Sequence, residues 1–432
     1  MKPNYRSVLA AAWLIAGTAT AADDGRAPAA AAGLTMQDAA QQAVQHQPLL
    51  DELDARARAE RESAIAARQL PDPSLMAGVS NLPVDTADAY SLRRDSDTQL
   101  QIGLNQELTR GRKRALRGDV GDARAAGYAI ERRATERSVR RDAALAWLAL
   151  WRNLRIVELA QANHVQAQTQ AAAVQIALES NRATQAELLA ARIEAGRMRD
   201  AVAAAEQSVD HARFLLSRWI GDLAFGPISE VLPAAVEPPS MEQTVSRVQS
   251  HPLLTERRNQ LETAQRQAEL ARASYAPDWR VQVGYAHRPD FSEMATLQFG
   301  VDLPVFTHQR QDRTLAAAQA QAEAAEHAID DSRRQLEAEA RLNHHDWLRL
   351  QQRLRDYDET LLPQAQQRID AALAAWSAGQ SALTTLLDAR RAALELQMTR
   401  VDLQYDFSQH AIQLQYLGAY DSAGDGVENP YE

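Results

Sequence analysis

The chain of 432 residues contains no cysteine. Disulfide bonds, thiolate metal sites, cysteine nucleophiles and an N-terminal lipidated cysteine all need a sulfur that this sequence lacks. Basic residues are also in the minority, with 47 Lys and Arg against 57 Asp and Glu and a net charge of -10. This balance argues against a nucleic-acid-binding protein, which needs a basic surface to replace phosphate counterions.

Aromatic residues and long apolar runs are scarce as well. Aromatics make up 5% of the chain, which is little for several ordinary globular cores. No uninterrupted apolar stretch approaches the about 20 residues of a membrane-spanning helix, so any membrane crossing would have to be made by strands. The sequence also lacks GxSxG, HExxH and a phosphate-binding glycine loop, and we therefore predict neither an enzyme nor a cofactor.

The N-terminus has the pattern of a secretory signal peptide. Lys2 and Arg6 precede an apolar run over residues 8–17, and the small residues 19–21 follow it. The apolar run is about half the length that a membrane anchor needs. We expect cleavage after Ala21.

An internal duplication organises the rest of the chain. Residues 44–52, VQHQPLLDE, resemble residues 248–256, VQSHPLLTE, and residues 188–192 resemble residues 386–390 in the same order. Such self-similarity indicates two structural repeats. The expected domains are a signal peptide (1–21), a first repeat (22–220), a Pro-rich linker (221–240), a second repeat (241–418) and a flexible acidic tail (419–432).

Each repeat is expected to hold a helix, a pair of strands and two very long helices joined at a tight turn. A helix over residues 113–180 would be roughly 100 Å long at 1.5 Å per residue. The turns fall at Asn181 and Gly379, because Asn and Gly most readily adopt the left-handed conformation that ends a helix. Pro363 is expected to break or kink its helix, since proline removes one backbone hydrogen bond.

The helices after the two turns carry apolar seams. In the first repeat one heptad seam runs through Leu188, Ala191, Ala195, Met198, Val202, Ala205, Val209, Ala212, Leu216 and Trp219. In the second repeat one seam passes through Leu394 and another through Leu396, and these positions lie about 200° apart on a helix. Opposite seams favour a curved wall of helices over an ordinary bundle, which would have one broad apolar stripe.

The strand candidates alternate strictly between apolar and polar residues. They cover residues 279–286 and 297–303 in the second repeat and residues 100–105 in the first, with a weaker candidate over 75–82. This alternation fits strands between lipid and water, although a sandwich strand alternates in the same way. The smallest known membrane barrels have about 8 strands. Four strands would therefore have to share a barrel with other copies of the chain.

Three segments of the second repeat carry a resemblance to a known family. The motifs of the TolC-like outer membrane factors resemble three segments here: LLPQAQ at 361–366, AWSAG at 375–379 and LLDAR at 386–390. The residues in these motifs are most similar to those of the cobalt-zinc-cadmium heavy-metal efflux branch. The resemblance implies a mixed α/β membrane protein. Long coiled-coil α-helices would form a periplasmic α-barrel, and four β-strands per chain would contribute to a trimeric outer-membrane β-barrel of about 12 strands.

The same resemblance implies where partners bind. The residues of the two helix turns would bind a periplasmic adaptor protein. The simpler interpretation is that these residues only cap the ends of the helices. These tip residues are Ser180, Asn181, Arg182, Ala378, Gly379 and Gln380.

Carboxylates just past the turns would narrow the closed periplasmic aperture of such a channel. Asp388 matches one position of the family's acidic rings, whereas Thr385 occupies the other ring position. Glu187 lies at a similar depth in the first repeat. Rings of carboxylates attract cations, although a solvated carboxylate on a helix face is the commoner reason for any single acid.

No metal site is predicted. His344, His345 and Asp346 are adjacent, and adjacent residues on a helix diverge by about 100°, so they seldom share one ion. His308 and His327 are expected to be surface residues.

The expected function is a passive exit duct for divalent heavy-metal cations. Its partners by resemblance are two further copies in a homotrimer, a periplasmic adaptor, an inner-membrane RND-type pump and outer-membrane lipid, with no lipid anchor. Alternatives are the same duct serving multidrug or type I secretion export, and a periplasmic coiled-coil scaffold without a pore.

Overall fold

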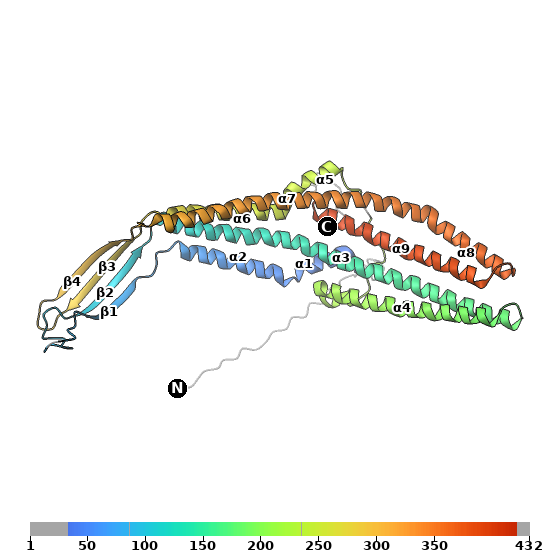
Figure 1. Cartoon of the computed structure of the whole chain (residues 1–432), viewed down its shortest axis with the longest axis horizontal. Coiled ribbons are helices and arrows are strands. Elements are labelled where there is room, and N and C mark those ends of the chain that lie inside the picture. Colours follow the sequence, from blue (N-terminus) through green and yellow to red (C-terminus); the bar gives the residue numbers. More distant parts are fainter. Residues whose placement is uncertain (1–32, 86, 235, 421–432) are drawn as a thin grey trace, which may run out of the picture.

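A computed structural model describes residues 33–85, 87–234 and 236–420 of the chain. The expected signal peptide lies outside the described residues, as does most of the expected tail. Figure 1 shows an elongated molecule with a small sheet at one end. The turns of two long helical hairpins lie together at the other end.

The two repeats have the same order of elements, as expected. The first repeat contains α1 (Met36–Gln45), α2 (Pro48–Ala67), β1 (Ser74–Ser80), β2 (Gln99–Leu108), α3 (Gly111–Glu179), α4 (Gln185–Ile220) and the 3-10 turn η1 (Gly221–Phe225). The second contains α5 (Met241–Arg247), η2 (Val248–Ser250), α6 (Pro252–Ala273), β3 (Trp279–His287), β4 (Met294–Val301), η3 (Thr307–Gln309), α7 (Gln311–Asp356), η4 (Tyr357–Leu361), α8 (Leu362–Ser377) and α9 (Leu383–Tyr416).

Local sequence signals explain where several helices begin. Pro48 and Pro252 are the first residues of α2 and α6, a position where the missing N–H group of proline costs nothing. Thr35 and Ser240 cap α1 and α5 in capping boxes, in which a side chain satisfies a free backbone N–H. Each repeat therefore opens with a short capped helix and a longer helix that starts at proline.

The four strands form one antiparallel sheet in the order β1-β2-β3-β4. Its register places the predicted apolar residues opposite one another on one face, where a single row joins Leu75, Leu104, Val283 and Leu297. Polar residues occupy the other face in the row of Asn105, Gln282 and Gln298. The predicted alternation is confirmed, and β1 and β4 each leave one edge unpaired within the sheet.

The helices lie side by side in a curved layer rather than around a central core. In the half nearer the sheet the order of contact is α2, α3, α6 and α7, and in the half nearer the turns it is α4, α3, α9 and α8. The 69-residue α3 belongs to both halves. Its length follows from the absence of proline between Pro83 and Pro227, because proline would interrupt the backbone hydrogen bonds of a helix.

Burial confirms the predicted seams. On α4 the residues Leu188, Ala191, Ala205, Val209, Ala212 and Leu216 are buried. On α9 both faces are buried, with Val401 and Ile412 packed in one cluster and Leu417, just past the helix, in another. This helix contacts α3 on one flank and α7 and α8 on the other, which is the arrangement that opposite seams predict.

The largest cluster of buried side chains lies midway along the helices. It joins α1, α3, α4 and α9 around Trp147 and Trp151. The Trp147 indole N–H donates to the Leu34 carbonyl at 2.9 Å, and that of Trp151 donates to the Glu230 carbonyl at 2.9 Å. Trp347, its counterpart in the second repeat, is also buried. The middle of the molecule is therefore the main tertiary junction between the repeats.

Pro363 distorts its helix as predicted. The five residues before Leu362 form the π-helical turn η4, and Pro363 follows in the first turn of α8. Because proline cannot donate a backbone hydrogen bond, the widened turn accommodates its ring without ending the helix.

The described part of the expected linker and the first two residues of the expected tail make tertiary contacts. The segment at 221–240 begins with η1 and pairs with the N-terminal segment through a parallel bridge between Leu34 and Ile228. Ala419 is fully buried, and the Tyr420 hydroxyl donates to the Val236 carbonyl at 3.1 Å. These two residues belong to the packed body, so the predicted tail boundary at 419 is too early, because tertiary packing extends past α9.

Among the described residues, no helix combines the length and the apolar character needed to cross a membrane.

Candidate functional site at the helix turns

The turns of the two long hairpins have the same backbone geometry. Asn181 has φ 56° and Gly379 has φ 72°, which confirms the predicted left-handed residues. The N–H of Arg182 donates to the Ala177 carbonyl, and the N–H of Gln380 donates to the Ala375 carbonyl, both at 2.8 Å. This is the Schellman pattern of a helix end. All six predicted tip residues are exposed, so both turns are open to a partner.

An apolar cluster holds the two hairpins together behind the turns. It contains Val174 of α3, Leu188 and Ala191 of α4, Ala372 of α8, and Leu383, Leu386, Leu387 and Ala389 of α9. The LLDAR segment therefore has a packing role. Its leucines and alanine point into the cluster, while the Asp388 side chain is 63% exposed.

Glu187 caps α4 and lies near the start of the second hairpin's helix α9. Its carboxylate accepts hydrogen bonds from the Thr184 backbone N–H at 2.8 Å and the Thr184 hydroxyl at 2.9 Å. The Leu383 backbone N–H, at the start of α9, is close enough to help lower the pKa of this carboxylate. The bond from the Thr184 backbone lowers the pKa of Glu187, and partial burial opposes this effect. The carboxylate thus caps α4 at a point near the start of α9.

A second contact between the hairpins is an ion pair of Glu194 on α4 with Arg391 on α9. The guanidinium donates to both carboxylate oxygens, at 3.0 and 2.6 Å. The Glu194 side chain is 8% exposed and that of Arg391 is 46% exposed. The hydrogen bonds to Glu194 raise the pKa of Arg391, although burial acts in the opposite direction. This bidentate geometry is the stronger form of an arginine-carboxylate contact.

Asp388 lies beside this ion pair rather than within it. One of its oxygens is 3.4 Å from the Arg391 guanidinium. The structure therefore brings Glu194 of the first hairpin together with Arg391 and Asp388 of the second, and Glu187 lies closer to the turns.

The histidine-rich segment of α7 does not gather ligands. The buried His344 ring contacts the Pro239 carbonyl at 2.9 Å, whereas Asp346 lies 3.9 Å from His410. Within the described part of the chain, no group of three His, Cys, Asp or Glu side chains is placed to hold a metal ion.

The capping role of Glu187 could have been found from the sequence, but the ion pair could not. Thr184 to Glu187 reads TQAE, the spacing of a capping box. Glu194 and Arg391 lie in different repeats and do not occupy equivalent positions. No local spacing pattern connects them.

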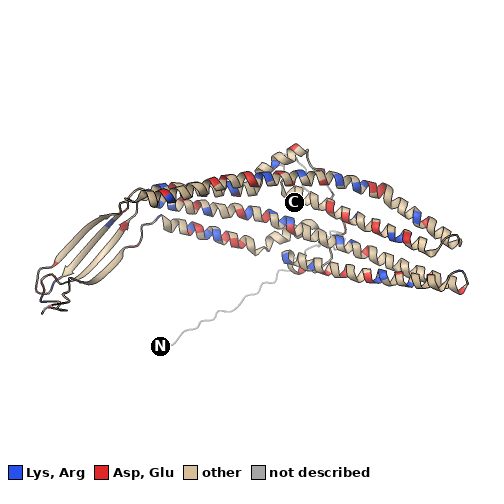
Figure 2. Ribbon diagram, viewed as in Figure 1, with Lys and Arg blue, Asp and Glu red and all other residues tan. Residues whose placement is uncertain are grey.

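The sheet at the other end of the molecule is exposed on its apolar face. Leu75 is 70% exposed, Leu297 is 61% exposed and Phe299 is 67% exposed. Figure 2 shows that the strands carry few charged residues compared with the helices. An exposed apolar surface of this kind marks a contact with lipid or with another protein.

The second repeat matches a known protein family. Residues 246–419 match the model of the outer membrane efflux protein family. A search of curated proteins found no match.

Solved structures match along most of the chain. CusC has a TM-score of 0.76 and 16% sequence identity, covering 88% of this chain and 91% of CusC. VceC, an outer membrane protein of Vibrio cholerae, has a TM-score of 0.71 and 18% identity, with 89% and 96% covered. The CmeC outer membrane channel of Campylobacter jejuni has a TM-score of 0.75 and 11% identity, with 90% and 87% covered.

These comparisons confirm the predicted resemblance to the TolC-like outer membrane factors. They also agree with the prediction that the chain is not an enzyme, because the family is one of efflux proteins. Residues 246–419 thus resemble the outer membrane efflux protein family, and most of the chain's length has the fold of outer-membrane channels.

Proposed function

We propose that three copies of this chain form the exit duct of a tripartite efflux system. The duct lies in the outer membrane, extends into the periplasm and passively conducts substrate that an adaptor and an inner-membrane RND-type pump deliver. The match of residues 246–419 to the outer membrane efflux family carries this proposal. The exposed apolar face of the sheet supports a place in lipid.

The trimer is supported by the surfaces that one chain leaves unpaired. The sheet has two open edges, at β1 and β4. On α4, apolar side chains at Ile193, Phe214 and Leu215 are 59%, 63% and 66% exposed. Copies placed side by side would pair the strand edges and cover these side chains. In a monomeric periplasmic scaffold these strand edges and apolar side chains would remain exposed to water.

The proposed cargo is a divalent heavy-metal cation. This proposal is supported by two short sequences, HPLL at 251–254 and LLDAR at 386–390. Both resemble the corresponding sequences of the cobalt-zinc-cadmium efflux branch. Drugs and secreted proteins are the alternative cargoes of the same duct.

Growth of a deletion strain on gradients of zinc, cobalt, cadmium, copper and several hydrophobic drugs tests the function and the cargo. We expect sensitivity confined to the divalent metals. Sensitivity to the drugs alone would support an efflux duct but exclude the metal branch, and unchanged growth on all of them would contradict the efflux role.

Complementation of the deletion strain with Gly379→Val should fail, while Gly379→Ala should restore more growth, because a β-branched residue is strained at positive φ.

The two exposed turns are the proposed contact with the adaptor, and Asp388 is the proposed acidic ring of the aperture. Three copies of this carboxylate around a narrow opening would attract cations. Glu187 is assigned a weaker part in the aperture, since its carboxylate already accepts two hydrogen bonds from Thr184.

Asp388→Ala should reduce the cation selectivity of single channels of the purified protein in a planar bilayer. Asp358→Ala serves as the control, because this half-exposed carboxylate pairs with Arg400 far from the turns. An unchanged reversal potential for Asp388→Ala would remove this residue from the aperture.

A further inference from the structure

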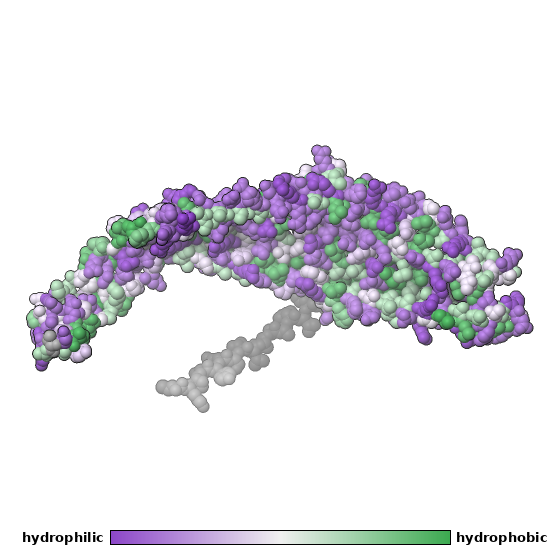
Figure 3. All heavy atoms as spheres, in the orientation of Figure 1, coloured by the Kyte–Doolittle hydropathy of each residue, from purple (hydrophilic) through white to green (hydrophobic). Residues whose placement is uncertain are grey.

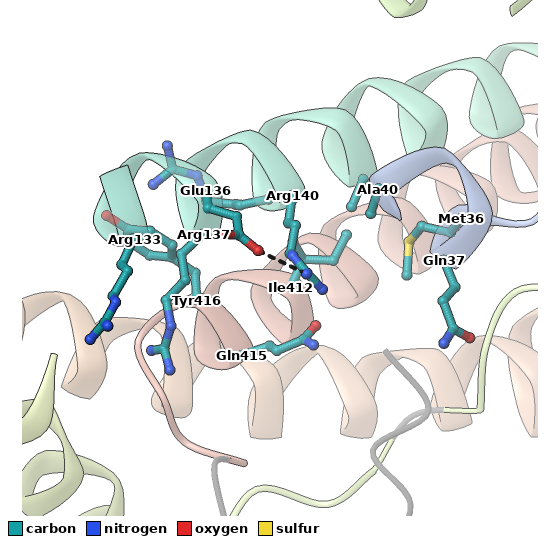
Figure 4. A pocket seen from close by; sticks show the side chains of 12 residues that line it. Met36, Gln37, Ala40, Arg133, Glu136, Arg137, Arg140, Ile412, Gln415 and Tyr416 are labelled. Carbon is teal, nitrogen blue, oxygen red and sulfur yellow. Dashed lines mark hydrogen bonds and ion pairs between the residues drawn. The ribbon is translucent and has the colours of Figure 1, made fainter. Parts of the chain in front are cut away.

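An arginine-lined pocket lies away from the turns, where α1, α3 and α9 meet. Its volume is about 340 Å³. Figure 4 shows Arg137 and Arg140 of α3 beside the end of α9, with Arg133 at one edge of the pocket and Met36 and Gln37 of the N-terminal helix α1 at the opposite edge. Arg141 completes the set of four arginines, and Met36 and Ile412 supply apolar surface. The pocket joins the first helix of the first repeat to the last helix of the second.

The pocket carries more positive than negative charge. Glu136 is the single acid among its lining residues, and it pairs with Arg140 at 3.0 Å. Arg141 pairs with Asp142 at 2.8 Å, and its guanidinium stacks 4.2 Å above the centre of the Tyr416 ring. Arg133 is exposed and has no ion-pair partner within the ranges that the structure describes.

Guanidinium groups that surround a partly apolar pocket fit a peptide that bears carboxylates. Arginine recognises carboxylates by paired hydrogen bonds, and the apolar lining can take the intervening side chains. The pocket therefore selects an acidic segment rather than a small neutral molecule.

The chain itself supplies such a segment next to the pocket. Residues 421–432, DSAGDGVENPYE, contain four acidic residues and no Lys or Arg. Tyr416 lines the pocket, and the described chain continues only to Tyr420. Twelve residues can span up to about 40 Å, which is ample to return to the pocket. Charge and position thus point to the same segment.

We propose that the acidic segment 421–432 docks through its carboxylates into the arginine pocket of its own chain. Docking neutralises the excess positive charge and fastens the end of α9 to α1 and α3. The proposal does not depend on the efflux function, because it concerns contacts within one chain.

A spin label on the segment tests the docking. The chain has no cysteine, so Asn429→Cys gives a single labelled position in the purified full-length protein. We expect an immobilised nitroxide at about 0.15 M salt and a mobile one at about 1 M, because the Debye length falls from about 8 to about 3 Å. The double variant Arg133→Gln, Arg140→Gln should raise the mobile fraction several-fold without added salt.

Arg199→Gln on α4 is the matched control, since Arg199 is an exposed arginine with no ion-pair partner among the described residues. It should leave the spectrum unchanged. A label that is mobile in the unaltered chain would overturn the proposal, as would an immobile label that neither salt nor the arginine variants release.

A disulfide distinguishes docking within one chain from docking between chains. Gln37 lines the pocket, and Gln37→Cys combined with Asn429→Cys should oxidise to a product that runs as a monomer on a denaturing gel. A covalent dimer would place the segment in the pocket of another copy and contradict the assignment.

Discussion

Replacing Trp147 with alanine should lower the free energy of unfolding by about 3–5 kcal/mol, the usual cost of emptying a buried tryptophan site. The side chain is fully buried, at 0% exposure, in the cluster that joins α1, α3, α4 and α9. It also donates a hydrogen bond to the Leu34 carbonyl. Denaturant unfolding of the purified protein, followed by circular dichroism, measures the loss.

Trp147→Phe separates packing from hydrogen bonding at this site. The phenyl ring fills most of the volume but cannot donate to Leu34, so we expect a smaller loss, dominated by the about 1 kcal/mol of the missing hydrogen bond. Equal losses for the two variants would show that the bond to Leu34 rather than ring packing holds this junction.

Arg391→Ala should loosen the contact between the two hairpins. The substitution leaves the Glu194 carboxylate, whose side chain is 8% exposed, without its bidentate partner. Hydrogen bonds to charged groups contribute about 1.5–3 kcal/mol, and the 46% exposure of the Arg391 side chain places the effect at the lower end. Since about 1.4 kcal/mol changes a population tenfold, local opening should rise about tenfold. Amide hydrogen exchange in residues 174–194 and 383–391 measures this opening.

Arg197→Ala provides the control. Arg197 is 3.9 Å from the same carboxylate, but its side chain is 65% exposed, so its removal should alter exchange little. The reversed pair Glu194→Arg, Arg391→Glu should restore part of the protection. Protection that survives Arg391→Ala would mean that the apolar cluster alone holds the hairpins. If the proposed aperture is correct, the loosened variant should also show larger single-channel conductance in a planar bilayer.

Local sequence signals were sufficient for most of the fold. The helix predicted over 113–180 is observed at Gly111–Glu179, because the absence of proline and the Asn181 turn fix its ends. The strand register follows from alternation, since a shift by one residue would exchange the apolar and polar faces. Opposite seams on α9 predicted its two neighbouring helices.

Contacts between distant parts of the chain could not be predicted from the sequence. The pair of Glu194 with Arg391 and the arginine pocket each combine residues from both repeats. Their geometry depends on how one hairpin lies against the other, and no spacing within either repeat encodes it. Ala419 was placed in a tail because its neighbours are polar and Gly-rich, yet packing against Trp347 buries it.

The capping of the two hairpins breaks the internal symmetry of the chain. The helix after the first turn begins with the capping box of Thr184 and Glu187. The helix after the second turn begins at Leu383, and its N-cap residue Ala382 makes no side-chain cap. The two hairpins thus differ in how their second helices begin. A protein that contacts both turns therefore meets two different helix starts, one beside each turn.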